Sequence, residues 1–82
     1  DEIAFHLIRT LLRAGKRVPE DIAVVSFDSS YYCTFGPVSI TSAGHEPHAM
    51  GHAAAENLLS QIRRQPCRSV RLPWTLYARQ SG

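Results

Sequence analysis

The stretch VPEDIAVVSFDSS, residues 18–30, decides the fold. Pro19 followed by two acids is typical of a turn, and Ile22–Phe27 is a short apolar run rich in β-branched residues, which favours a strand. Because this run does not alternate with polar residues, we expect both strand faces to be buried, as in an inner parallel sheet between helices. The strand runs into Asp28, and ligands of open α/β sheets bind at the carboxyl ends of strands.

The segment before this strand predicts an amphipathic helix. In residues 1–14 the apolar side chains recur three and four positions apart. Asp1 is expected to cap the first turn, and Gly15 to end the helix in the left-handed conformation. A helix, a tight connection and a strand form half of an α/β unit, so the predicted fold class is α/β, with a parallel sheet flanked by helices.

A second helix is predicted downstream, over residues 47–64. Pro47 suits the first helical position, and Glu46 favours the amino end of the helix. A short extended piece over residues 38–42 precedes it. After it, residues 70–78 are expected to form a strand, whose internal proline predicts an edge position or a bulge.

Length and composition exclude several classes of protein. With 82 residues the chain is one domain at most, and a chain of this size buries only about 60 to 65 per cent of its unfolded surface. The net charge is +2 and the arginines are scattered, so no basic block predicts direct nucleic-acid binding. The two cysteines, Cys33 and Cys67, are far apart and are expected to be reduced thiols in the cytoplasm. No apolar run reaches the roughly 20 residues that span a bilayer, so no membrane partner is expected.

The candidate binding residues are Asp28, Tyr31, Tyr32 and Phe35, in a predicted loop over residues 28–37. A carboxylate at a strand end can accept hydrogen bonds from two adjacent sugar hydroxyls, and aromatic rings can cover the apolar faces of a sugar. The alternative is structural: Asp28 caps a turn, and the aromatic side chains fill a subunit interface. The residues alone leave both interpretations open.

No other motif predicts chemistry. His45, His48 and His52 form H-x-x-H-x-x-x-H, in which two histidines four apart could share a metal, but the H-E-x-x-H glutamate is missing. We expect a solvated first turn or a subunit contact, with no metal and no cofactor. Ser26 lacks the glycines of the G-x-S-x-G nucleophile elbow. The chain is therefore not expected to be an enzyme.

The order of the pieces resembles a known family. DEIAFHLIRTLLRAG, KRVPEDIAVVSFD, ITSAGHEPHAMGHAAAENLL and LPWTLYARQS together resemble the carboxyl-terminal stretch of the effector domain of lactose-repressor/galactose-repressor (LacI/GalR) transcriptional regulators. The most specific portion is GKRVPEDIAVVSFD, similar to the family signature G-x-x-V-P-x-D-(I/V)-x-V-V-G-(F/Y)-D. Two departures stand out: Ser26 replaces a glycine, and Ser29 replaces a second acid.

The resemblance implies a fragment of a two-lobed, periplasmic-binding-protein-like fold. Residues 1–37 would belong to one lobe, residues 38–64 would hold a crossover and a helix of the other lobe, and residues 65–82 would return as a strand. In this family the acid that matches Asp28 contacts a sugar effector in the cleft between the lobes, and the loop after it contributes to a dimer contact.

The implied function is that of part of a cytoplasmic, homodimeric repressor that reads DNA through an N-terminal domain outside this chain. Effector binding would alter the angle of the lobes and so the affinity for the operator. The alternative is a periplasmic sugar-binding protein of a transport system with the same fold.

Overall fold

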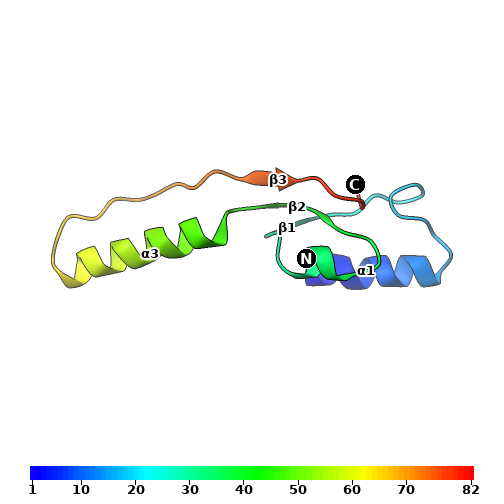
Figure 1. Ribbon diagram of the computed structural model, residues 1–82, viewed down its shortest axis with the longest axis horizontal. Coiled ribbons are helices and arrows are strands. Elements are labelled where there is room, and N and C mark those ends of the chain that lie inside the picture. Colours follow the sequence, from blue (N-terminus) through cyan, green and yellow to red (C-terminus); the bar gives the residue numbers. More distant parts are fainter. The chain divides into compact units, whose positions relative to one another are not determined.

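A computed structural model describes all residues, 1–82, as two compact units. The first unit combines Asp1–Gly44 with Thr75–Gly82, and the second is His45–Trp74. Figure 1 labels the elements along the chain. The assignment of residues 1–37, 38–64 and 65–82 to lobes stays a prediction.

The first unit is built on a three-stranded sheet in the order β1-β2-β3. Strand β1 (Val25–Phe27) pairs in parallel with β2 (Thr41–Gly44), and β2 pairs antiparallel with β3 (Thr75–Tyr77). The predicted α/β class and the parallel pairing are therefore confirmed, and the antiparallel β3 makes the sheet mixed.

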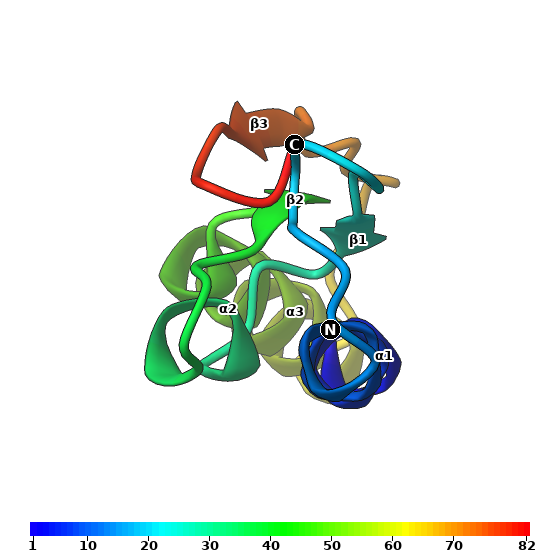
Figure 2. The same ribbon diagram turned by 90° about the vertical axis from the view of Figure 1, so that its right-hand side faces the viewer.

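Two helices lie side by side against this sheet (Figure 2). They are α1 (Glu2–Arg13) and the short α2 (Tyr32–Phe35). Their apolar faces meet the sheet in one core, in which Ile8 and Ile40 are each 1% exposed. The prediction for residues 28–37 was wrong in part, because an irregular loop was expected where α2 forms.

Helix α1 confirms the predicted amphipathic helix, and Gly15 has the expected left-handed backbone, with φ of 78°. The expected cap at Asp1 is wrong. Its side chain makes no capping hydrogen bond and instead accepts hydrogen bonds from residues in other parts of the unit. Tertiary donors therefore take the oxygens that a local cap would have used.

The predicted strand over residues 22–27 is shorter than expected, and it is not buried on both faces. Only Val25–Phe27 forms β1, and Val25 and Phe27 are 65% and 66% exposed. Val25 and Phe27 lie on the same face of the strand, opposite to the partly buried Ser26, and their exposure means that the rest of the chain covers this face poorly.

The other two predicted strands are displaced or shortened. The extended piece predicted over residues 38–42 forms β2 at Thr41–Gly44. The strand predicted over residues 70–78 is limited to Thr75–Tyr77, an edge strand that begins after Pro73. Since proline cannot donate a ladder hydrogen bond, the strand starts beyond it.

The second unit consists of α3 (Pro47–Ile62) and the chain that follows it to Trp74. Pro47 stands at the first helical position, as predicted, and the Glu46 side chain accepts hydrogen bonds from the amides of His48 (3.1 Å) and Ala49 (2.7 Å). None of the residues of α3 is buried. No helix of the structure is long and apolar enough to cross a membrane.

Candidate functional site

Asp28 follows β1 directly, at the carboxyl end of a parallel strand. It lines a hollow of about 290 Å³ together with Asp1, Ser26 and apolar side chains of α1 and β1. Its side chain is exposed and takes part in neither of the two salt bridges of the chain, and none of the chain's donors bonds to its carboxylate. Both oxygens are therefore available to hydroxyl donors of a ligand.

The backbone that carries this carboxylate is unusual and firmly held. Asp28 and Ser29 both have positive φ angles, 85° and 51°, which few residues other than glycine adopt. Three successive amides of the turn are tethered: Asp28 N donates to Ala43 O (2.7 Å), Ser29 N to Ser42 Oγ (3.0 Å) and Ser30 N to the Asp1 carboxylate. Such backbone geometry persists where the surroundings over-determine it, and such positions cluster at ligand sites.

Gly44 allows β2 to approach this turn closely. A Cβ atom at Gly44 would lie 2.7 Å from the carbonyl oxygen of Asp28 and 3.1 Å from the Cβ of Ser29. Glycine is needed here because any side chain would push the turn away from the strand.

Arg79 stabilises the Asp28 turn through hydrogen bonds. Its guanidinium donates to the Ser29 hydroxyl (2.9 Å) and to the Ile40 carbonyl (2.7 Å), and it lies 5.4 Å from the Tyr77 ring. No carboxylate lies within salt-bridge distance of it. The guanidinium therefore links the segment that follows β3 to the Asp28 turn through a neutral partner.

The aromatic candidates form a separate group on α2 and on Tyr31, the residue that precedes it. Phe35 stacks on Tyr31 (centroids 5.3 Å apart) and on Phe5 of α1 (5.5 Å), and Tyr32 lies 5.6 Å from Phe5. Tyr31 and Phe35 are exposed. The structure thus brings Tyr31, Tyr32 and Phe35 together, but none of them lines the hollow beside Asp28.

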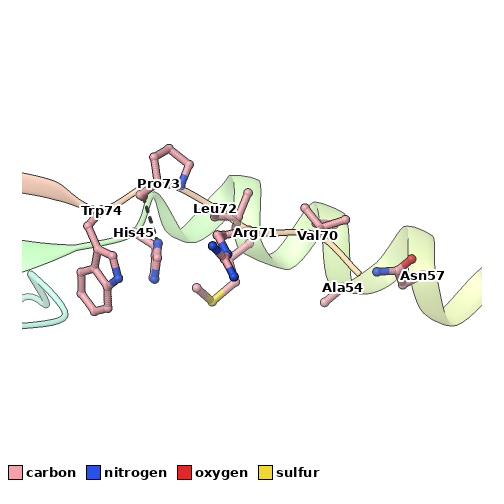
Figure 3. Close-up of a pocket in the computed structure, with 10 residues that line it drawn as sticks. His45, Ala54, Asn57, Val70, Arg71, Leu72, Pro73 and Trp74 are labelled. Carbon is pink, nitrogen blue, oxygen red and sulfur yellow. Dashed lines mark hydrogen bonds between the residues drawn. The ribbon is translucent and has the colours of Figure 1, made fainter. Parts of the chain in front are cut away.

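A larger groove, of about 810 Å³, lies within the second unit (Figure 3). Met50, Ala54 and Asn57 of α3 form one side, and the extended segment 70–74 forms the other. His45 closes one end, with Nδ1 3.0 Å from the Pro73 carbonyl and its ring 4.2 Å from Trp74. The lining of this groove is mainly apolar, so the groove lacks the convergent acceptors that a polyhydroxylated ligand needs.

The histidine pattern does not assemble a metal centre. His52 is paired with Glu56 (3.1 Å) on the exposed surface of α3, while His45 faces Trp74. No group of three His, Cys, Asp or Glu side chains is placed to hold a metal ion. Cys33 and Cys67 are free thiols, the first buried and the second exposed.

Sequence reasoning missed the residues that support Asp28, namely Asp1, Ser42, Gly44 and Arg79. Asp1 was interpreted as a local cap, and Ser42 and Gly44 carry no signal until β2 is aligned with β1. Arg79 had one weak signal, the resemblance of Arg79-Gln80-Ser81 to the family's usual ending.

Comparison with known proteins agrees with this fold. The family description "Periplasmic binding protein-like domain" matches residues 1–82, the whole chain. The chain is 37% identical over 62 residues, 76% of its length, to the arabinose metabolism transcriptional repressor of Geobacillus stearothermophilus, of which it covers 17%. It is 33% identical over its full length to the HTH-type transcriptional regulator CelR of Thermobifida fusca, of which it covers 25%.

Solved structures show the same similarity. A LacI family transcriptional regulator from Enterococcus faecium with bound ribose superposes with a TM-score of 0.88 at 31% identity, over 99% of this chain and 31% of that one. This chain therefore belongs to the periplasmic binding protein-like domain family, and it is similar to transcriptional regulators, among them a LacI family regulator of known structure. It spans a third or less of the length of these relatives.

Proposed function

We propose that the chain forms part of the sugar-binding site of a LacI-family repressor, and that Asp28 accepts hydrogen bonds from the sugar. The observation that carries this proposal is the exposed Asp28 carboxylate at the carboxyl end of β1, which makes no hydrogen bond within the chain. The relatives are transcriptional regulators, and a similar solved regulator holds ribose.

The chemistry of Asp28 suits a polyhydroxylated ligand. Its two oxygens can each accept a hydrogen bond from one of two adjacent hydroxyls, and hydrogen bonds to a charged acceptor are about twice as strong as neutral ones. The tethered turn keeps the carboxylate in place before the ligand arrives, so little ordering entropy is lost on binding.

The aromatic side chains hold a secondary place in this proposal. Tyr31, Tyr32 and Phe35 lie outside the Asp28 hollow, next to the buried ring of Phe5. Tyr32 is partly buried against the core, whereas the exposed rings of Tyr31 and Phe35 suit either the apolar face of a sugar or a contact between two subunits, and both roles stay proposals.

The regulatory part of the proposal concerns the longer protein. A sugar that binds one arrangement of the two lobes more tightly than another shifts the population of the lobes. In a cytoplasmic homodimer this shift would change operator affinity through an N-terminal DNA-binding domain. The transport-protein alternative is not favoured, because the relatives reported above are regulators.

The first prediction is that Asp28→Asn in the full-length protein raises the sugar concentration needed for release from operator DNA about 100-fold. Asn keeps the size of the side chain but loses the charge and one acceptor, a loss of about 3 kcal/mol for two charge-assisted bonds. Fluorescence anisotropy measures the release, on an operator fragment selected by the wild-type protein, with ribose, glucose, cellobiose, sucrose and arabinose in turn.

Asp21→Asn is the matched control, because Asp21 is a carboxylate that does not line the hollow and accepts its hydrogen bonds from Arg17. It should release at the wild-type sugar concentration. An unchanged half-maximal concentration in Asp28→Asn, or no response of the wild-type protein to any of these sugars, contradicts the proposal.

A further inference from the structure

Asp1 occupies the point where the parts of the first unit meet. Its Oδ1 accepts hydrogen bonds from Ser26 Oγ on β1 and from Ser42 Oγ on β2, the latter at 3.0 Å. Its Oδ2 accepts the amide of Ser30, just before α2. One carboxylate at the start of α1 thus binds β1, β2 and the segment that leads into α2.

The two carboxylates of the hollow differ in what their oxygens do. Asp1 and Asp28 both line it, but both Asp1 oxygens are taken by donors of the chain, whereas none of those donors bonds to Asp28. Asp1 accepts three hydrogen bonds, and because a carboxylate offers about four acceptor sites, little of its capacity is left for a sugar. In the same hollow, Asp1 therefore supports the structure, and Asp28 is available to a ligand.

Asp1 acts on the turn that carries Asp28 from two directions. It binds the Ser30 amide directly, and it binds the Ser42 hydroxyl, whose oxygen in turn accepts the Ser29 amide. These bonds fix the residues that follow Asp28 while Asp28 and Ser29 are in the left-handed region. Because that conformation is unfavourable for residues with a Cβ, it needs such external ties.

We infer that Asp1 is a positioning residue of the sugar site: its charge holds the Asp28 turn in the binding conformation and does not itself contact the ligand. This inference rests on the proposed function, since it assigns Asp1 a role in the same site. In Asp1→Asn one carboxylate oxygen becomes an NH₂ donor. If this donor faces the Ser30 amide, two donors meet and the tie is lost.

The experiment measures sugar affinity in the full-length protein by titration calorimetry, with ribose, glucose, cellobiose, sucrose and arabinose as probes. Asp1→Asn should weaken binding of the sugar that the wild type binds by at least 10-fold. The control Asp21→Asn, which also removes a carboxylate that accepts several hydrogen bonds from the chain, should change it less than 2-fold.

A double-mutant cycle separates positioning from general destabilisation. If Asp1 acts through Asp28, Asp1→Asn should cause less than a 2-fold further loss in the Asp28→Asn background. An equal loss in both backgrounds, or wild-type affinity in Asp1→Asn, overturns the inference while the sugar proposal stands. Wild-type affinity in Asp28→Asn overturns both.

If Asp1→Asn does not fold, Ser42→Ala is measured in its place. Ser42→Ala removes the hydroxyl that donates to Asp1 and accepts the hydrogen bond from the Ser29 amide. A loss of at least 3-fold in sugar affinity supports the inference, and unchanged affinity overturns it.

Discussion

At the scale of single residues, the Ser29 hydroxyl gives the Arg79 guanidinium a neutral partner where a carboxylate would give it a charged one. Arg79 reaches it at 2.9 Å and finds no carboxylate within salt-bridge distance. The resemblance places a second acid at this position, so the exchange for serine leaves a partly buried cation bonded to neutral groups. Ser29 has φ of 51°, a region that aspartate tolerates better than most residues.

Ser29→Asp should therefore stabilise the protein by about 1 kcal/mol, the upper range for a partly exposed ion pair. Urea unfolding of the full-length protein measures the difference. The gain should shrink in 1 M salt, where the Debye length is about 3 Å. The double variant Ser29→Asp, Arg79→Met controls for effects of the aspartate alone, and a gain that persists in it would contradict the ion-pair explanation.

The sequence is informative about Asp28 and misleading about Asp1 for the same reason. Both acids stand at the end of a predicted element, and local rules assign such a residue either a ligand role or a cap. Asp28 keeps its predicted place because β1 ends at Phe27, where the apolar run of the sequence also ends. Asp1 does not cap α1 because Ser26, Ser30 and Ser42 offer it better donors, and only the folded chain brings these together.

At the scale of elements, the two long helices α1 and α3 were predictable, but the short helix α2 and the lengths of the strands were not. Pro47 and Glu46 set the start of α3 through contacts within one turn, which the sequence displays directly. The length of β1 depends instead on how far β2 runs beside it, and the pairing covers only Val25 to Phe27. Exposure of the β1 side chains depends in addition on neighbours far away in the sequence.

The stabilisation of the start of α3 by Glu46 depends on pH, and it decreases as the pH falls. The amides of Ala49 and His48 hold the pKa of Glu46 below its ordinary value. A carboxyl with a lowered folded pKa stabilises the helix above its unfolded pKa, about 4.3, and loses this contribution as the pH falls through the folded value.

In Glu46→Gln the amide resonances of Ala49 and His48 should no longer titrate in the acid range, whereas in the wild type they should shift as the pH falls through the lowered pKa of Glu46. Two-dimensional NMR of the full-length protein between pH 2.5 and 6 follows both amides. Titration of these amides in Glu46→Gln with the wild-type midpoint would show that another group is responsible.

At the scale of the whole molecule, the chain holds part of a binding domain. Val25 and Phe27 are exposed on an edge strand, and α3 has no buried residue. Apolar strands of parallel sheets are normally covered on both faces, so this exposure is typical of a portion of a larger α/β domain. The chain covers 25% of CelR, in agreement with that interpretation.

The central claim is that the Asp28 carboxylate binds a sugar. The most direct test is a crystal structure of the full-length protein with the sugar that releases it from DNA. We predict that both Asp28 oxygens lie within hydrogen-bond distance, about 2.5 to 3.0 Å, of two adjacent sugar hydroxyls. A bound sugar that leaves the Asp28 carboxylate without contact, or a carboxylate turned toward the backbone amides of its own turn, would contradict the account.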